Sequence, residues 1–294
     1  MSFGEVASSA IKYAREGITV HPTMSKFLSR YQENYRMWPS YSNIWQKNGH
    51  PLEVGDLLVQ TDLAASIQFM ADQEAAAMKN GREKGLQAAR DAFYVGDIAS
   101  KIVKYHKENG GLMTAGDMAN YATPIEKPLS INFRGTEVYS CRPWCQGPVL
   151  LQMLNMLNDI DLKAMGHNST NYIHYLAETI KLSFADRERY YGDPNFVDVP
   201  VEKLLSSEFA RQRQEQINLQ KAWPKMPPAG EIEGFGGISL RSKTNSDASF
   251  SEPDTSYTCT MDEHGNVCSI TPVSYTHLRA HETLRYLVCR LLLE

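Results

Sequence analysis

The chain has 294 residues, enough for one large domain or two small ones, and its 42% hydrophobic and 22% charged residues are ordinary for a globular protein. Its net charge of -4 and its scattered Lys and Arg residues exclude the basic surface that binds nucleic acid. No apolar run reaches the roughly 18 residues that a membrane-spanning helix requires. The chain has five cysteines: Cys141, Cys145, Cys259, Cys268 and Cys289. Their spacing predicts neither a disulfide framework nor a zinc site.

The N-terminal part of the chain is predicted to be largely helical. Apolar residues at helical spacing predict a helix over residues 3–17, and Gly17 suits the C′ position at its end. We expect the aromatic-rich stretch 23–48 to be helical as well, with its rings serving packing rather than a binding cleft. A turn at 50–58, a helix from Asp62 or Leu63 to about Gln73 and two short helices within 86–108 follow.

Strands and longer helices are predicted further along. A loop at 110–114 leads to a short helix at 117–121, and alternation over 130–140 predicts a strand pair about Arg134-Gly135. An apolar helix then follows Gln146-Gly147-Pro148, a second follows the cap residues Asn168-Ser169 and ends near Tyr191, and a last one starts within 204–210. The expected apolar faces are Leu150, Leu151, Leu154, Leu157 and Ile160 in the first helix, and Tyr172, Ile173, Leu176, Ile180 and Phe184 in the second.

Two conspicuous motifs are interpreted as structural rather than functional. The charged run Asp186-Arg187-Glu188-Arg189 has helical spacing, which is typical of a solvated face with local ion pairs rather than of a catalytic carboxylate. The glycine-rich run Gly234-Phe235-Gly236-Gly237 lacks the Lys-Ser/Thr of a phosphate-binding loop and is expected to be a linker.

The chain is organised around residues 253–271. The preceding run, 241–252, is polar and poor in apolar side chains, as a mobile linker is. Residues 255–261 and 267–271 are rich in β-branched and aromatic residues and flank Asp262-Glu263-His264-Gly265-Asn266. This pattern predicts a β-hairpin with a glycine-containing turn. A linker that runs into a strand beginning with Thr255 is typical of an N-terminal-nucleophile hydrolase before it cleaves itself.

This segment resembles the nucleophile region of the γ-glutamyltransferase (γ-glutamyltranspeptidase) family. There a Thr lies ten residues before the Gly of an Asp-x-x-Gly-Asn turn, the spacing of Thr255 and Gly265. The family's usual Thr-Thr-His-Tyr-Ser is replaced by Thr255-Ser256-Tyr257-Thr258-Cys259, a departure that bears on substrate choice. The resemblance continues in three other stretches in the same order, which are 93–121, 134–155 and 185–206.

The resemblance implies an α+β fold, part of an αββα N-terminal-nucleophile hydrolase sandwich and mostly its helix-rich large-subunit portion. It implies autocatalytic cleavage between Asp254 and Thr255, followed by transfer or hydrolysis of γ-glutamyl groups by Thr255 without a metal or cofactor. The implied partners are glutathione-like substrates, water or amino-acid and peptide acceptors, and the large and small chains after cleavage. In the family an Arg binds the substrate carboxylate and a Gly-Gly pair downstream of the nucleophile binds the oxyanion, and no residue here can be assigned either role.

The implied division is a partial large-subunit region at 1–240, a flexible linker at 241–254 that ends at the cleavage site, and the start of the small subunit at 255–272. Residues 273–294 resemble the translation of a sequencing adapter and are expected to be an artefact. The resemblance also implies a chain truncated at both ends; no signal peptide is visible at Met1.

Two alternatives stay open at this point. One is a related N-terminal-nucleophile acylase with another acyl substrate, for which Ser256 would be a reserve nucleophile. The other is a helical interaction module without catalysis. Self-cleavage before Thr255 would separate the enzymes from the module.

Overall fold

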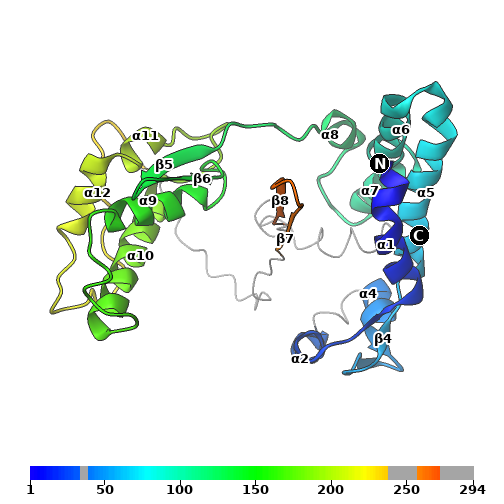
Figure 1. Ribbon diagram of the computed structural model, residues 1–294. Coiled ribbons are helices and arrows are strands. Elements are labelled where there is room, and N and C mark those ends of the chain that lie inside the picture. Colours follow the sequence, from blue (N-terminus) through cyan, green and yellow to red (C-terminus); the bar gives the residue numbers. More distant parts are fainter. Residues whose placement is uncertain (34–38, 238–256, 272–294) are drawn as a thin grey trace. The chain divides into compact units, whose positions relative to one another are not determined.

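The computed structural model describes residues 1–33, 39–237 and 257–271. Contacts divide the described residues into two compact units: the first holds those of 1–123 together with 257–271, and the second holds 124–237 (Figure 1). Helices and antiparallel strand pairs make up both units, which confirms the α+β class. Every sheet in the described ranges has two strands. The predicted linker 241–254 and the segment 273–294 lie outside these ranges.

Long helices form the larger part of the first unit. They are α1 (Phe3–Glu16), α5 (Thr61–Ala77), α6 (Arg82–Tyr94) and α7 (Asp97–Glu108), with η1 (Met78–Asn80) between α5 and α6. The predicted helix after residue 61 is longer than expected because Glu74 and three alanines, all good helix formers, extend it. Gly17 ends α1 with a φ of 93°, as its position predicted.

A buried carboxylate joins α1 to α5. Glu74 is 2% exposed, and its oxygens accept hydrogen bonds from the backbone N–H groups of Phe3 (2.8 Å) and Gly4 (2.9 Å). These groups belong to the first turn of α1, where backbone N–H groups have no partner within the helix. The apolar contact between the same two helices is made by Ile11, Ala14 and Ala64.

Short elements complete the first unit. The aromatic-rich stretch contains α2 (Pro22–Arg30) and α4 (Pro39–Trp45), followed by strand β2 (Gln46–Lys47), which pairs with β3 (His50–Pro51). Strand β1 (Ile18–Thr19) pairs with β4 (Leu57–Leu58), so the predicted turn at 50–58 includes two short strands. Helix α8 (Ala115–Asn120) begins at the capping box of Thr114 and Asp117.

The second unit begins with the predicted strand pair, β5 (Leu129–Phe133) and β6 (Thr136–Ser140). Helix α9 (Gly147–Leu157) contacts both strands and also helices α10 (Thr170–Tyr190) and α12 (Ser207–Gln214). The expected last helix is in fact two, α11 (Val201–Leu204) and α12, because Ser206 caps a new helix through its side chain. Met156, Leu182 and Ala210 form the core between these helices.

The predicted apolar faces of α9 and α10 are wrong in part. On α10, Ile173 and Ile180 are exposed, whereas the buried side of the helix includes Leu182 and several polar residues. On α9, Leu150 is exposed. Hydrophobicity alone misplaced the face because α10 buries polar side chains whose hydrogen-bond partners come from other segments. The buried set of α10 is Tyr175, Glu178, Thr179, Leu182, Ser183, Ala185, Asp186 and Tyr190.

The glycine-rich run at 234–237 is more ordered than a linker. Ile232 and Phe235 form an isolated antiparallel bridge, and both pack against Tyr190 and Leu204. Strands β7 (Thr258–Met261) and β8 (Val267–Ile270) form the last described element, an antiparallel hairpin.

The corrected face of α10 can be tested by paired truncations. Leu182→Ala removes a side chain with no exposed surface and should lower the free energy of unfolding by about 2–5 kcal/mol. Ile180→Ala, on the same helix and 46% exposed, should cost much less. Urea unfolding followed by circular dichroism measures both, and equal losses would contradict the assignment of the buried face.

Candidate functional site

The predicted nucleophile Thr255, the preceding Asp254 and the reserve nucleophile Ser256 lie outside the described residues. The described part of the site begins at Tyr257 and consists of the hairpin that follows the predicted nucleophile in sequence. Strand β7 begins at Thr258, and its residues pair with β8 from Thr258 opposite Ile270 to Met261 opposite Val267. The hairpin prediction for residues 255–271 is thus confirmed over the described part.

The hairpin turn has the geometry that its sequence predicted. The backbone N–H of Asp262 donates to the carbonyl of Asn266 (3.0 Å), and the N–H of Gly265 donates to the carbonyl of Asp262 (3.1 Å). Gly265 has a φ of 80°, a conformation that side chains with a Cβ atom disfavour. The glycine of the Asp-x-x-Gly-Asn pattern is therefore required by the backbone of the turn.

The carboxylate of Asp262 holds the turn together. It accepts hydrogen bonds from the backbone N–H groups of His264 (2.9 Å) and Asn266 (2.8 Å) and from the side-chain amide of Asn266 (2.7 Å). The Asn266 side-chain and backbone donors favour the charged carboxylate and lower the pKa of Asp262. Asp and Asn in this pattern thus have a structural function in the hairpin that follows the predicted nucleophile in sequence.

Both strands of the hairpin are exposed along their whole length. Their apolar side chains include Met261 (74% exposed), Val267 (66%) and Ile270 (52%), and Tyr257, just before β7, is 64% exposed. One side-chain hydrogen bond spans the strands, from the Ser269 hydroxyl to the Tyr257 hydroxyl oxygen (3.2 Å). Within the described ranges, each strand pairs only with the other.

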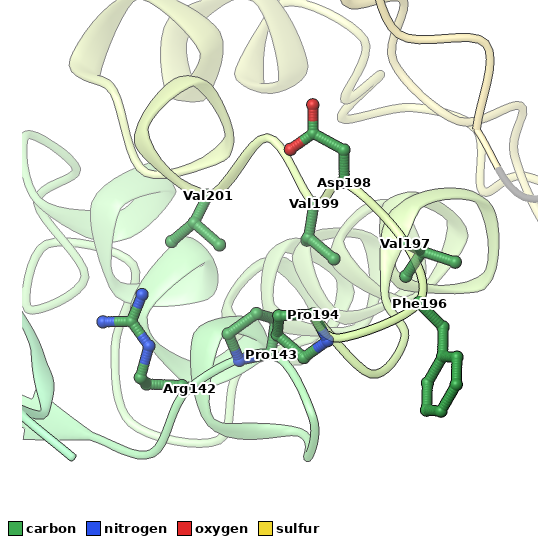
Figure 2. Close-up of a pocket in the computed structure, with 8 residues that line it drawn as sticks. All are labelled: Arg142, Pro143, Pro194, Phe196, Val197, Asp198, Val199 and Val201. Carbon is green, nitrogen blue, oxygen red and sulfur yellow. The ribbon is translucent and has the colours of Figure 1, made fainter.

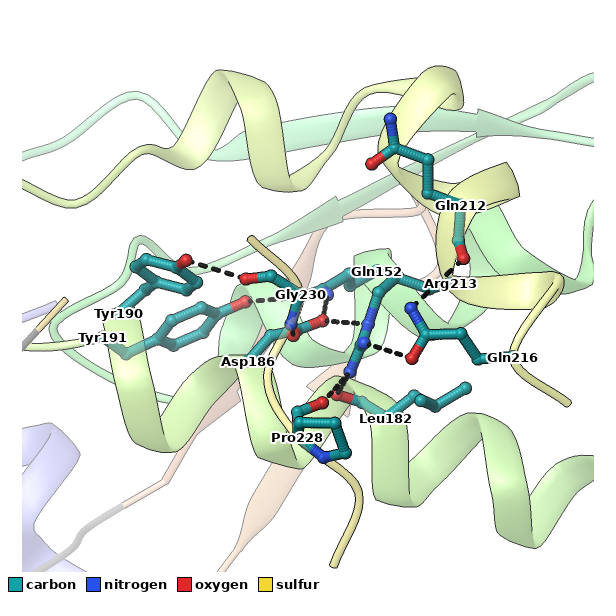
Figure 3. A network of polar contacts seen from close by, with 10 residues as sticks. All are labelled: Gln152, Leu182, Asp186, Tyr190, Tyr191, Gln212, Arg213, Gln216, Pro228 and Gly230. Atoms are coloured by element: carbon teal, nitrogen blue, oxygen red, sulfur yellow. Dashed lines mark hydrogen bonds and ion pairs between the residues drawn. The ribbon is translucent and has the colours of Figure 1, made fainter. Parts of the chain in front are cut away.

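Asp186, in the second unit, is fully buried, so its interpretation as part of a solvated face is wrong. Its carboxylate accepts hydrogen bonds from the Gln152 amide (2.5 Å), the Gly230 backbone N–H (2.7 Å) and the Arg213 guanidinium (3.1 Å) (Figure 3). The remaining charges of the run do form ion pairs near the surface, Arg187 with Glu188 and Arg189 with Glu231.

Arg213 completes this buried network. It is 1% exposed, and beyond Asp186 it donates to the carbonyls of Leu182 (3.1 Å) and Pro228 (3.0 Å) and to the side chain of Gln216 (2.8 Å). Burial opposes charge on both ion-pair partners, so it raises the pKa of Asp186 and lowers that of Arg213.

Two tyrosines extend the network. The Tyr190 hydroxyl donates to the carbonyl of Gly230 (2.7 Å), and the Tyr191 hydroxyl donates to the side chain of Gln152 (3.2 Å) (Figure 3). Burial raises the pKa of Tyr191 strongly, so this hydroxyl stays protonated. Since Asp186 has no exposed surface, its carboxylate is closed to a substrate; it fixes the segment at 228–230 to α10.

A pocket of about 470 Å³ lies on the second unit (Figure 2). It combines two charged side chains, Arg142 and Asp198, with apolar ones, and none of the predicted site residues belongs to it. The Arg142 Nε lies 4.0 Å from a carboxylate oxygen of Glu126. The lining residues are Arg142, Pro143, Pro194, Phe196, Val197, Asp198, Val199 and Val201.

The described ranges offer neither a metal-binding cluster nor a membrane-spanning helix. These residues contain no cluster of three or more His, Cys, Asp or Glu side chains that could hold a metal ion. None of the described helices is long and apolar enough to cross a membrane.

Comparison with known proteins identifies the family. The sequence model of the γ-glutamyltranspeptidase family matches residues 1–281 of this chain. The chain belongs to the γ-glutamyltranspeptidase family. The resemblance found in the sequence is thereby confirmed, and with it the fold class of an N-terminal-nucleophile hydrolase. The members of this family are enzymes, which favours the enzymatic interpretation over a helical interaction module.

Three relatives show the extent of the similarity. The glutathione hydrolase proenzyme of Escherichia coli strain K12 is 32% identical over 275 residues, which are 92% of this chain and 42% of that protein. The acylase ACY 1 proenzyme of Pseudomonas sp. strain SE83 is 30% identical over 274 residues, or 92% and 43% of the two chains. The crystal structure of Helicobacter pylori γ-glutamyltranspeptidase superposes with a TM-score of 0.67 at 29% identity, covering 78% of this chain and 62% of that one.

The chain spans less than half the length of the glutathione hydrolase proenzyme and of the acylase proenzyme.

The sequence predicted the hairpin that follows the predicted nucleophile, but it did not indicate the buried network of Asp186. One signal could have indicated it, since Asp186 follows Leu182 by four residues and precedes Tyr190 by four, on the buried side of the helix. The partner Arg213 is distant in sequence and gave no local signal.

Breaking the buried ion pair should strongly destabilise the second unit. Asp186→Ala leaves the Arg213 guanidinium buried without its counter-ion and should cost roughly 3–5 kcal/mol. Glu231→Ala breaks the pair with Arg189 and should cost much less, because water screens that pair. Denaturant unfolding of both variants measures the difference, and similar small losses would contradict a structural role for Asp186.

The stability of the hairpin turn should decrease as the pH falls. The folded-state pKa of Asp262 lies below its unfolded value of about 3.9, so the stabilisation is present above that value and is lost as pH falls through the folded-state pKa. We expect the amide resonances of His264 and Asn266 to titrate below about pH 3.9 in NMR spectra, and Asp262→Asn to abolish this titration. A midpoint at or above the unfolded value would contradict the hydrogen-bonded turn.

Proposed function

We propose that the protein to which this chain belongs cleaves itself between Asp254 and Thr255 and then transfers or hydrolyses γ-glutamyl groups through Thr255. Its substrates are small γ-glutamyl compounds such as glutathione, and its acceptors are water, amino acids or peptides. The large and small chains produced by cleavage stay associated. The chemistry uses no metal or cofactor.

The main support is the position of Thr255 relative to the hairpin, in a chain that belongs to this family. Strand β7 begins three residues after Thr255, and the turn at Asp262–Asn266 has the hydrogen bonds that its sequence pattern requires. A relative that is 32% identical is named a glutathione hydrolase proenzyme, a name that implies activation by processing.

The proposed cleavage is an intramolecular acyl shift. The hydroxyl oxygen of Thr255 attacks the carbonyl carbon of Asp254, the C–N bond breaks, and the acyl group moves from nitrogen to oxygen as an ester. Water hydrolyses this ester, which releases Asp254 as a new C-terminus and Thr255 as a new N-terminus. No external nucleophile other than water is needed.

Cleavage would provide the base for the second reaction. A free α-amino group has a pKa of about 7.7–8.0, close to the pH at which an enzyme of this kind would work. Thr255 would then carry nucleophile and base on one residue. In the acyl-transfer step the free α-amino group takes the hydroxyl proton as the Thr255 oxygen attacks the γ-carbonyl carbon, the C–N bond of the donor breaks, and the leaving amine receives that proton. The γ-glutamyl group then moves from the Thr255 ester to water or an amine acceptor, which restores the hydroxyl.

The oxyanion formed in each step needs donors, and loss of one donor typically costs on the order of 10² to 10³ in rate. In the family these donors come from a Gly-Gly pair downstream of the nucleophile, and the chain spans less than half the length of the curated relatives it matches. The activity is therefore proposed for the whole protein rather than for these 294 residues alone.

A second candidate is an acylase of the same fold. It is favoured by the 30% identity to the acylase ACY 1 proenzyme and by the unusual Ser256-Tyr257-Thr258 after the predicted nucleophile. Its substrate would carry an acyl group other than γ-glutamyl.

Cleavage and nucleophile can be tested together in the intact parent protein. We expect wild type to separate into two chains, with Thr255 at the N-terminus of the smaller one, whereas Thr255→Ala should stay whole because it lacks the attacking hydroxyl. Thr255→Ser retains a hydroxyl and should still cleave, which makes it the matched control. Edman sequencing decides the position; a start at Ser256 or an uncleaved wild type would contradict the proposal.

The acyl group can be assigned with two chromogenic anilides. γ-Glutamyl anilide and glutaryl anilide have the same chain length and differ only in the α-amino group. Faster release of aniline from the γ-glutamyl compound by the processed parent supports the γ-glutamyltransferase activity. Preference for glutaryl anilide would support the acylase instead.

A further inference from the structure

The loop between β6 and α9 brings two cysteines together. It consists of Cys141-Arg142-Pro143-Trp144-Cys145-Gln146, between the end of β6 at Ser140 and the start of α9 at Gly147. The spacing of the two cysteines predicted no disulfide, but the fold of the loop places them close to each other.

A turn within the loop produces this proximity. The backbone N–H of Cys145 donates to the carbonyl of Arg142 (3.2 Å), and the Trp144 indole donates to Glu126 (2.6 Å), which holds the tip of the loop. Both cysteines lie against Gly147. A Cβ atom added to Gly147 would lie 2.2 Å from the carbonyl oxygen of Cys141, and the Gly147 N–H donates to the Cys145 sulfur at 3.4 Å.

The two thiols themselves interact. The backbone of Cys141 and the sulfur of Cys145 both border Gly147, and, after burial, the neighbouring Cys141 side chain adds to the rise in the pKa of the Cys145 thiol. Cys141 is exposed, whereas Cys145 is half-buried, and this burial raises the pKa of the Cys145 thiol. An external reagent therefore reaches Cys141 first, and Cys145 is the shielded neighbour.

We propose that Cys141 and Cys145 form a reversible dithiol–disulfide site that exchanges with low-molecular-weight disulfides such as glutathione disulfide. In the first step the Cys141 thiolate attacks one sulfur of the disulfide, forms a mixed disulfide and releases one thiolate. In the second step the Cys145 thiolate attacks the Cys141 sulfur and releases the second thiolate. The protein dithiol loses two electrons and two protons, and one glutathione disulfide becomes two glutathione molecules.

Oxidation at this site would act on the neighbouring pocket. Arg142 and Pro143 lie between the two cysteines in sequence and line the pocket on the second unit (Figure 2). A disulfide would fix the turn that carries both residues. The inference depends on the geometry of the loop alone and not on the activity of Thr255, so the two proposals can fail independently.

The hairpin supplies an internal control. Cys259 and Cys268 are both exposed, but Cys259 lies opposite Ser269 and Cys268 lies opposite Thr260. Residues directly opposite each other share a face, and neighbours along a strand alternate between faces, so these two side chains lie on opposite faces of the hairpin. They meet the reagent as readily as Cys141 does, but they cannot form a disulfide with each other within one hairpin.

The test is redox titration of the reduced full chain with glutathione and glutathione disulfide, followed by acid quenching, alkylation and mass spectrometry. Trypsin does not cut the Arg142–Pro143 bond, so both cysteines remain in one peptide. At about 0.1 mM free glutathione we expect the Cys141–Cys145 disulfide to exceed the mixed disulfide at Cys141 by about tenfold or more, because an intramolecular thiol has an effective concentration on the order of millimolar. Dithiothreitol should reverse it.

Two variants separate the steps. Cys145→Ser should trap glutathione on Cys141, and Cys141→Ser should take up much less glutathione because Cys145 is shielded. Wild-type Cys259 and Cys268 should show mixed disulfides without a bond between them. Independent alkylation of Cys141 and Cys145 in oxidised wild type, or persistent glutathione on both, would overturn the proposal, and this wild-type result decides even if a variant misfolds.

Discussion

The ion pair of Asp186 with Arg213 is the interaction on which the second unit depends. Removing two charges from water is costly, and the structure offsets this cost by giving the carboxylate two further donors, Gln152 and Gly230. These partners belong to α9, α12 and the segment at 228–230, so one side chain of α10 joins three separate parts of the chain. Hydrophobic contacts around Leu182 bury apolar surface, whereas the ion pair and its hydrogen bonds connect α10 to these particular segments.

The positions of the helices and strands could largely be predicted from the sequence, because they depend on local chemistry. Ser169 and Ser206 cap α10 and α12 as their residue types suggest, and Arg134-Gly135 turns the β5–β6 pair. The buried face of α10 could not be predicted, since it depends on partners far away in sequence. Arg213 lies 27 residues after Asp186, and Gly230 lies 44 residues after it.

In the candidate site, too, the local features could be predicted from the sequence and the others could not. The turn at Asp262–Asn266 is local, and both its glycine and its carboxylate have the function that the pattern indicates. The assignment of Thr255 depends on the family to which the chain belongs and on spacing, because the residue lies outside the described ranges. The proximity of Cys141 and Cys145 could not be inferred from spacing, since it depends on how the loop turns against Gly147.

The exposed hairpin has a consequence for the behaviour of the chain in solution. Strands β7 and β8 each pair only with the other over the described residues, so the outer edge of each presents backbone donors and acceptors, and apolar side chains flank them. Such edges favour pairing between molecules. Self-association should therefore rise with protein concentration. An increase in the light scattered by this chain would then reflect edge-to-edge assembly of folded molecules as well as aggregation of unfolded ones.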